Sequence, residues 1–108
     1  MASNSIILSE REEYILLVLM KGERYGNQIM EAIEEVSNDV IPIGCRTYPL
    51  LRRLKKGGYV DSRLEEAGLE IRRGNRRTYY WITDKGINAL KCRQEFRQAL
   101  LNWKPSPS

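Results

Sequence analysis

The sequence predicts a mainly helical domain with a small β-hairpin, an α+β fold. Apolar residues recur at spacings of three and four through most of the chain, which is the period of a helix. The alternation typical of strands is confined to residues 59–64 and 77–82. The chain has 108 residues and is 42% hydrophobic, which is enough for one domain with one modest core.

The first helix is expected over residues 10–20. Ser9 and Glu12 have the spacing of a capping box at its start, and Gly22 lies just beyond its end. Its second half is apolar on every side, so both faces must be covered. We expect one face to pack on the core and the other on a second subunit. The residues expected at that second face are Tyr14, Leu17 and Val18.

A second helix is expected from about residue 25 to residue 36. Ile29, Ile33 and Val36 follow one another at spacings of four and three, which gives one apolar stripe. Glutamates occupy the solvated side of the same helix. A short connector over residues 40–44 leads into the next helix.

The third helix, over residues 46–56, has one leucine face and one cationic face. At about 100° per residue, the side chains that cluster on the apolar side are Thr47, Leu50, Leu51 and Leu54. Arg52 and Lys56 lie near the centre of the opposite side. Pro49 falls in the first turn, where its missing N–H costs little, and Gly57-Gly58 ends the helix. This helix alone is consistent with a solvated basic face or with a surface that enters a nucleic-acid groove.

A basic β-hairpin follows the basic helix. Residues 59–64 and 77–82 form its strands, with Tyr80 and Ile82 directed at the core. Four arginines surround a Gly-Asn turn signal between the strands: Arg72, Arg73, Arg76 and Arg77. A basic helix followed directly by a basic hairpin is the arrangement of a winged helix-turn-helix.

The last helix extends beyond the domain. Thr83 is its expected N-cap, and it continues to about Asn102. Ile87 and Leu90 can pack on the domain. Further along the helix, apolar residues at spacings of three and four form a stripe: Ala89, Cys92, Phe96, Leu100 and Trp103. This stripe needs a cover, so we expect it, with Ala99, to form a dimer interface together with the first helix. Packing of the stripe within one monomer is the alternative.

The charge is distributed unevenly along the chain. Residues 1–40 hold three basic and eight acidic side chains, a net charge of −5. Residues 41–108 hold fifteen basic and six acidic side chains, a net charge of +9. This asymmetry favours a polyanionic partner for the second part of the chain. A basic surface that only keeps the protein soluble is the alternative.

Several function classes lack the residues that they need. There is no histidine, and Cys45 and Cys92 lie far apart, so neither a metal site nor a cofactor is expected. A redox role for either thiol is an alternative to plain burial. With no evident pairing of nucleophile and base, the chain is not expected to be an enzyme. The longest apolar run, residues 14–20, is far shorter than the roughly 20 residues of a membrane span, and residues 1–5 do not resemble a signal peptide.

A combined pattern of motifs points to a known family. Its segments are Tyr25-Gly26, Tyr48-Pro49-Leu50-Leu51-Arg52-Arg53-Leu54, Gly58, Arg76-Arg77-Thr78-Tyr79-Tyr80 and Ile82-Thr83-Asp84-Lys85-Gly86. Over roughly residues 9–103 the chain resembles the PadR family of transcriptional regulators. The resemblance implies a winged helix-turn-helix homodimer that represses transcription at a palindromic operator, with the first and C-terminal helices forming the dimer. The short length matches members with a single C-terminal helix; the cyanobacterial regulator Pex is one winged-helix relative.

One segment departs from the family pattern. Relatives usually have Gly-[Thr/Ser]-[Leu/Ile]-Tyr-Pro where this chain has Cys45-Arg46-Thr47-Tyr48-Pro49. The start of the recognition helix therefore gains a positive charge, and we expect the individual DNA specificity of this chain to lie there.

The residues of the third helix and the hairpin are expected to contact double-stranded DNA. Arg46 or Arg52 are suited to reading guanine, and Arg53, Lys55 and Lys56 to neutralising phosphates. By resemblance, the Tyr25 hydroxyl contacts a phosphate. The full expected set is Tyr25, Arg46, Thr47, Tyr48, Pro49, Arg52, Arg53, Lys55, Lys56, Arg72, Arg73, Arg76 and Arg77.

Four segments are expected along the chain. A flexible N-terminal arm covers residues 1–8, the winged-helix DNA-binding domain residues 9–86, the C-terminal dimerisation helix residues 87–103, and a disordered tail residues 104–108. We expect a cytoplasmic bacterial protein that lies on the nucleoid when it is bound to DNA.

Two other functions remain open at this point. The first is a ligand-responsive regulator that senses an aromatic small molecule at the dimer interface, in a space lined by Tyr14, Phe96 and Trp103. The second is a winged-helix protein–protein adaptor, although an adaptor does not need so many basic residues on the helix and the hairpin.

Overall fold

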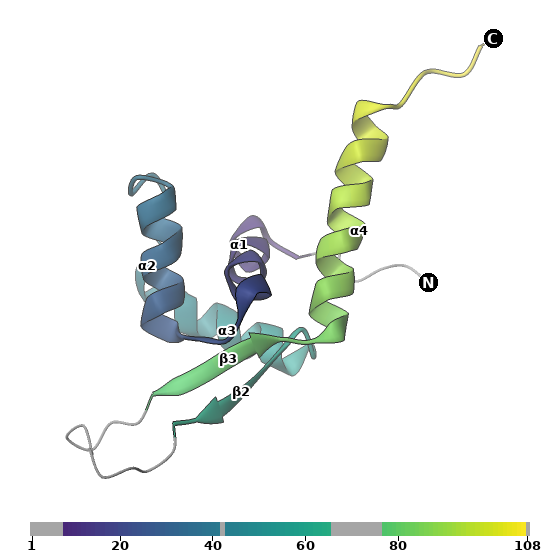
Figure 1. Cartoon of the computed structure of the whole chain (residues 1–108). Helices are drawn as coiled ribbons and strands as arrows, with labels where there is room; N and C mark the ends of the chain where they lie inside the picture. Colours follow the sequence, from purple (N-terminus) through teal and green to yellow (C-terminus); the bar gives the residue numbers. More distant parts are fainter. Residues whose placement is uncertain (1–7, 42, 66–76, 108) are drawn as a thin grey trace.

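Four helices and a small antiparallel sheet make up the described part of the chain, residues 8–41, 43–65 and 77–107 of a computed structural model (Figure 1). The α-helices are α1 (Glu10–Val18), α2 (Gly26–Val36), α3 (Thr47–Lys56) and α4 (Asp84–Leu101). The strands are β1 (Arg24–Tyr25), β2 (Val60–Leu64) and β3 (Thr78–Ile82), and 3-10 turns η2 (Leu19–Lys21) and η3 (Gly44–Arg46) precede β1 and α3. The predicted winged helix-turn-helix fold with a long C-terminal helix is confirmed.

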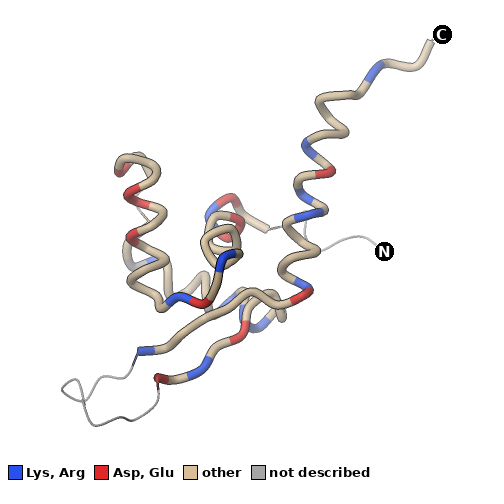
Figure 2. The backbone as a smooth tube through the Cα atoms, viewed as in Figure 1, with Lys and Arg blue, Asp and Glu red and all other residues tan. Residues whose placement is uncertain are grey.

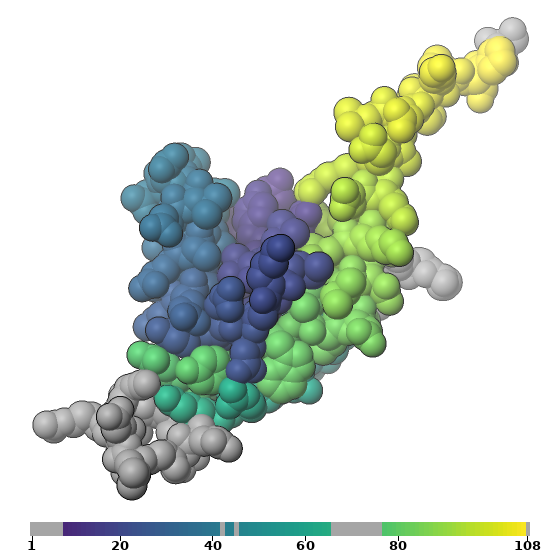
Figure 3. All heavy atoms as spheres, viewed as in Figure 1, coloured from purple at the N-terminus to yellow at the C-terminus, as the bar shows by residue number. Residues whose placement is uncertain are grey.

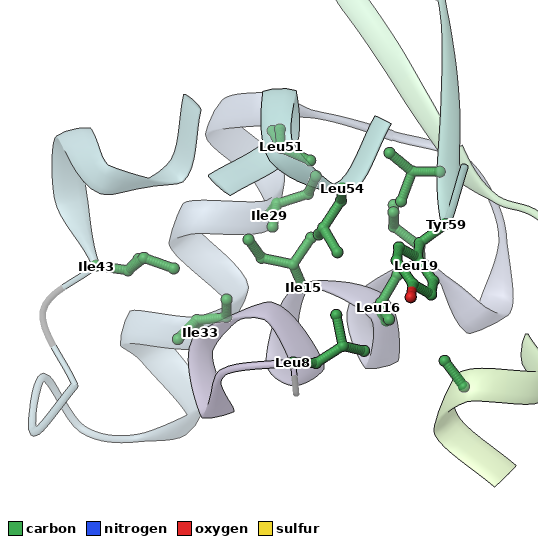
Figure 4. Close-up of a cluster of buried hydrophobic side chains, with 12 residues drawn as sticks. Leu8, Ile15, Leu16, Leu19, Ile29, Ile33, Ile43, Leu51, Leu54 and Tyr59 are labelled. Carbon is green, nitrogen blue, oxygen red and sulfur yellow. The ribbon is translucent and has the colours of Figure 1, made fainter. Parts of the chain in front are cut away.

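The core lies between the first three helices and the sheet. Figure 4 shows apolar side chains of α1, α2 and α3 directed at one another. The fully buried members from these helices are Ile15, Leu16, Ile29, Leu51 and Leu54. Burying one such side chain contributes about 1.5–3 kcal/mol, so this cluster is the main source of stability. Leu8 also belongs to it, which ties the residue before the predicted domain start to the core.

α1 begins as predicted and ends earlier than predicted. The backbone N–H of Glu12 donates to Ser9 Oγ at 3.1 Å, and the N–H of Ser9 donates to Glu12 Oε1 at 2.8 Å, which is the predicted capping box. The α-helix stops at Val18, and residues 19–21 form a 3-10 turn that closes at Gly22. The first helix is therefore shorter than the predicted residues 10–20 because its last turn tightens before the glycine.

The sheet has three strands instead of the predicted two. Its order is β1-β3-β2, and both pairs are antiparallel. Tyr25 lies opposite Tyr79, which in turn lies opposite Arg63. Tyr80 and Ile82 of β3 pack against the core as predicted. The central strand therefore joins the start of α2 to the hairpin.

α4 leaves the body of the domain after its first turns. Thr83 caps it by accepting a hydrogen bond from the N–H of Gly86 at 3.2 Å. Gly86 and Ala89 are buried and Leu90 packs on the core, whereas residues 94–101 are exposed. In Figures 1 and 3 the far part of this helix stands clear of the other elements.

Two apolar residues lie differently from the prediction. Val36, expected on the buried stripe of α2, is exposed at the last residue of the helix, where it lines a groove with Tyr14 and Leu17 of α1. Ile87, expected to pack on the domain, is also exposed. Within the described residues, every helix is too short or too polar to cross a lipid bilayer.

Candidate nucleic-acid interface

α3 is amphipathic in the way that its sequence predicts. Leu51 and Leu54 are fully buried in the core, and Leu50 packs against it. The side chains on the other face are exposed and cationic: Arg52, Arg53, Lys55 and Lys56. Pro49 lies in the first turn, where a missing N–H leaves no helix bond unmade. The apolar face anchors the helix while the cationic face stays open to a partner.

The entry to α3 is a tight turn built on Gly44. Gly44 has φ of 41°, and its N–H donates to Glu34 Oε2 at 3.1 Å. The hydroxyl of Thr47 donates to the Gly44 carbonyl at 2.8 Å, and Thr47 is fully buried. Thr47 was expected to contact DNA, but burial removes its side chain from the exposed surface. Arg46, the last residue of η3, is exposed beside the start of α3.

Tyr48 connects α3 to the start of α2. Its ring lies on Gly26, where an added Cβ would come within 2.6 Å of Tyr48 Cε1. Its hydroxyl donates to Asn27 Oδ1 at 3.2 Å. A polar hollow of about 490 Å³ opens here, lined by Tyr25, Gly26, Asn27, Glu31, Tyr48, Arg77, Thr78 and Tyr80. The hollow brings together three residues predicted to contact DNA: Tyr25 of β1, Tyr48 of α3 and Arg77, which directly precedes β3.

Tyr80 lies on the inner side of this region. Burial raises the pKa of the Tyr80 hydroxyl above its usual value, the nearby Tyr48 raises it further, and Arg52 opposes the change. These effects show that the β3 residue and the α3 surface share one electrostatic environment.

A row of two aromatic rings flanked by two guanidinium groups crosses the sheet. The Arg77 guanidinium lies 4.2 Å from the centre of the Tyr25 ring, and the Arg63 guanidinium lies 4.9 Å from that of Tyr79. The Tyr25 and Tyr79 rings meet edge to face at 5.7 Å. The register places Tyr79 opposite both Tyr25 and Arg63 on the adjacent strands, so this part of the row follows from strand pairing, and Arg77 directly precedes β3. It fixes Tyr25 and Arg77 against each other.

Three of the four arginines predicted for the hairpin, Arg72, Arg73 and Arg76, lie outside the described residues. Of the four predicted hairpin arginines, the structure thus describes Arg77, at the base of the hairpin beside Tyr25.

Two cations of α3 also make contacts within the protein. Arg53 Nε lies 3.3 Å from Glu12 Oε2, although the Arg53 side chain remains 67% exposed. Lys55 Nζ donates to Ser62 Oγ at 2.7 Å, which ties α3 to β2. Both side chains therefore help to hold α3 in place in addition to any contact with a partner.

The residues predicted for the dimer interface lie on two open apolar surfaces. On α1, Tyr14 and Val18 are half-buried and Leu17 is exposed, and they line a groove of about 310 Å³ next to α2. On α4 and just after it, Cys92 is half-buried, and the exposed members are Phe96, Ala99, Leu100 and Trp103. Figure 2 shows acidic residues along α2 and mainly basic residues along α4.

Sequence reasoning missed Asn27 and a cluster between α1 and α4. Glu13 is 5% exposed and accepts hydrogen bonds from Arg93 and Arg97. The hydrogen bonds that Arg97 donates to Glu13 raise the pKa of the Arg97 guanidinium above its usual value. Glutamates at the start of the first helix and two arginines four residues apart in the last helix were visible signals. Only the fold could show that they meet.

Comparison with known proteins places these features in a family. A family model described as "Transcriptional regulator PadR-like family" matches residues 15–92. A transcriptional regulator from Clostridium thermocellum, Cth-833, is 31% identical, with 83% of this chain and 86% of that chain covered and a TM-score of 0.67. A comparison with curated proteins found no match.

Two further solved structures show the same arrangement. RosR from H. salinarum is 25% identical, with 94% of this chain and 84% of that chain covered and a TM-score of 0.70. Bacillus subtilis PadR, solved in complex with operator DNA, is 26% identical, with 90% of this chain and 50% of that chain covered and a TM-score of 0.59. A particular likeness to Pex stays an expectation.

Proposed function

Because the chain belongs to the PadR-like family of transcriptional regulators, we propose that it binds a palindromic operator in double-stranded DNA as a homodimer and represses transcription. The observation that carries this proposal is the exposed cationic face of α3 on a helix whose other face is buried. The operator DNA named for the Bacillus subtilis relative supports the same partner for this chain. A regulatory rather than an enzymatic role follows from the family itself.

α3 would enter the major groove with its cationic face. Arg46 and Arg52 are the proposed base readers, since a guanidinium can donate two hydrogen bonds to guanine. Lys56 and the exposed part of Arg53 would neutralise flanking phosphates. Tyr25 lines the polar hollow beside α3, which suits the expected contact of its hydroxyl with a phosphate.

A homodimer would present two copies of α3 to DNA. The open apolar surfaces of α1 and α4 support such a dimer, because both need a cover that the described residues of one chain do not provide. Two half-sites about one helical turn apart would follow from the two-fold symmetry. The protein would act in the cytoplasm, on the nucleoid.

Duplex binding at two salt concentrations tests the proposal. A duplex recovered from a random pool by selection with the wild-type protein is the probe, and a shuffled duplex of equal length is the control. If six to ten phosphates are neutralised per dimer, affinity should fall by about 10³–10⁵ between about 50 mM and 200 mM salt. Failure to enrich any duplex, or binding that ignores salt, would contradict a DNA-binding role and favour a protein–protein adaptor.

A second function is favoured by the groove on α1. Tyr14, Leu17 and Val18 line it with apolar side chains of α2, and its volume of about 310 Å³ fits a small aromatic molecule. Of the residues expected to line this space, Tyr14 does so within one chain, and Phe96 and Trp103 do not. Such an effector would bind where the second subunit is expected and would weaken operator binding. Quenching of tryptophan fluorescence by planar aromatic compounds, with operator release in the same titration, would support this function. Quenching without operator release would contradict it.

A further inference from the structure

Two adjacent glutamates near the start of α1 are buried and contact different helices. Glu12 is 1% exposed and lies 3.3 Å from Arg53 on α3. Glu13 is 5% exposed and binds Arg93 and Arg97 on α4. The first turn of α1 therefore contacts both the helix proposed to read DNA and the helix proposed to dimerise.

The contacts of Glu13 have a defined geometry. Arg97 donates from Nη1 to Glu13 Oε2 at 2.7 Å and from Nη2 to Oε1 at 2.8 Å, a bidentate pair. Arg93 Nε donates to Oε1 at 3.2 Å, and Arg93 Nη1 donates to the Leu8 carbonyl at 2.7 Å. Bidentate pairs fix the relative orientation of their partners as well as their distance. The two arginines thus hold one face of α4 in one orientation against α1.

These contacts lie beyond the apolar packing of α4. Ala89 and Leu90 pack on the core, whereas residues 94–101 are exposed. Arg97 follows Leu90 by about two helical turns. The ion pair therefore restrains a stretch of α4 that the apolar core no longer holds.

The direction of α4 matters because the helix is long. Its 18 residues span about 27 Å at a rise of about 1.5 Å per residue. A tilt of about 10° would move its far end by about 5 Å, which exceeds the rise of about 3.4 Å per base pair along a DNA strand. If two chains meet along α4, a change in this angle alters the separation of their α3 helices by a comparable amount.

We propose that Glu13, Arg93 and Arg97 form a positioning site that sets the half-site spacing accepted by the dimer. This inference rests on the proposed DNA-binding dimer and adds residues outside the sets expected to contact DNA or to form the subunit interface. A buried ion pair can be replaced as a whole by apolar packing with little loss of stability, so its directional contacts are the property that distinguishes this cluster. The neighbouring Glu12 joins the same turn of α1 to α3 through its contact with Arg53.

The test measures binding to duplexes in which the separation of two selected half-sites varies by single base pairs. The wild-type protein is expected to lose at least about tenfold in affinity when the spacing changes by one base pair. Glu13→Gln keeps the volume and removes the charge, and it should reduce that discrimination to about threefold or less. Affinity for a single half-site should change by less than about twofold, because α3 is untouched.

Arg97→Gln provides a second variant that does not leave a charge unpaired in the core. The Arg97 side chain is 53% exposed, so the chain should fold, and the bidentate pair is lost. Glu95→Gln, at an exposed carboxylate on the same helix, is the matched control and should keep wild-type discrimination. If both Glu13→Gln and Arg97→Gln keep it as well, the inference is overturned. Failure of the wild-type protein to bind any duplex would instead overturn the proposed function.

Discussion

Gly86 shows how a single residue can be fixed by its neighbours. It is the third residue of α4, and an added Cβ would meet the carbonyl oxygen of Tyr59 and lie 2.6 Å from Ile82 Cγ1. The glycine lets α4 approach the end of β3 and the start of the hairpin. Glycine lowers the intrinsic stability of a helix by about 1 kcal/mol, so close packing decides the residue here.

Gly86→Ala is therefore expected to destabilise the protein by about 1–3 kcal/mol, although alanine has a higher helix propensity than glycine. Urea unfolding followed by circular dichroism measures the change. Asn88→Ala, at an exposed position of the same helix, is the control and should be close to neutral. An unchanged or raised midpoint for Gly86→Ala would contradict the close approach of α4.

Tyr80 predicts a dependence of stability on alkaline pH. Its folded-state pKa is raised above the usual 10.0, mainly by burial, so the unfolded chain loses this proton first as the pH rises. The contribution of Tyr80 is fully present below pH 10.0 and is lost as the pH rises through the folded-state pKa. Tyr80→Phe should flatten the fall in unfolding free energy above about pH 10. Equal alkaline profiles for wild type and Tyr80→Phe would contradict this.

At the residue scale, the contacts of individual polar side chains of α3 could not be predicted from the sequence. The cationic face of α3 followed from helical angles alone, and so did its leucine face. Thr47 falls on the apolar side by the same angles, yet it was included in the expected set of DNA contacts. The structure shows it buried with its hydroxyl on the Gly44 carbonyl. Arg53 had a predicted role at phosphates, and its contact with Glu12 depends on how α1 and α3 pack.

At the scale of elements, α2 and α3 meet at one aromatic contact. The Tyr48 ring covers Gly26 at the first residue of α2, and its hydroxyl reaches Asn27. This contact sets the angle between the two helices of the helix-turn-helix unit. It joins Gly26 of the Tyr25-Gly26 motif to Tyr48 of the Tyr48-Pro49 motif, which the sequence had suggested separately.

A double-mutant cycle tests that contact. Gly26→Ala should cost about 1–2 kcal/mol in the wild-type background, because Tyr48 must move. In a Tyr48→Ala background the same change should cost less than about 0.5 kcal/mol, since the clash is gone. Chemical denaturation of the four proteins gives the coupling. Equal costs in both backgrounds would mean that the ring does not lie on Gly26.

The helices and the hairpin strands could be predicted from the sequence because each carries its own period and cap. β1 could not, since a strand of two residues is too short to show alternation, and its existence depends on pairing with β3. The end of α1 was predicted two residues late for a similar reason. Its 3-10 turn keeps the apolar residues of a helix and differs only in its hydrogen bonds.

At the scale of the molecule, one chain leaves apolar surface open at α1 and α4. The exposed residues of α4 gather at the end that stands clear of the domain in Figure 3. The position of these residues could be predicted from their spacing. The direction that the ion pairs at Glu13 give to α4 could not be predicted, because these pairs join residues about 80 positions apart.

The double variant Leu100→Ala/Trp103→Ala is expected to weaken the proposed dimer. Both side chains are more than half exposed, so their removal should leave the folding of the domain unchanged. Sedimentation equilibrium should show a dissociation constant raised by about tenfold or more, while circular dichroism stays that of the wild type. Gln98→Ala, on the same exposed stretch, is the control. A dissociation constant that does not change would contradict an interface at this end of α4.

The most direct test of the central claim, that the cationic face of α3 reads operator DNA, is the affinity of Arg52→Ala for selected and random duplexes. Fluorescence anisotropy at one salt concentration measures both, with Lys104→Ala as a control that removes an equal charge away from α3. Arg52→Ala should weaken binding to the selected duplex by about 5–150-fold and to random DNA by about threefold or less. Equal losses on both duplexes, or a loss no greater than that of Lys104→Ala, would contradict the claim.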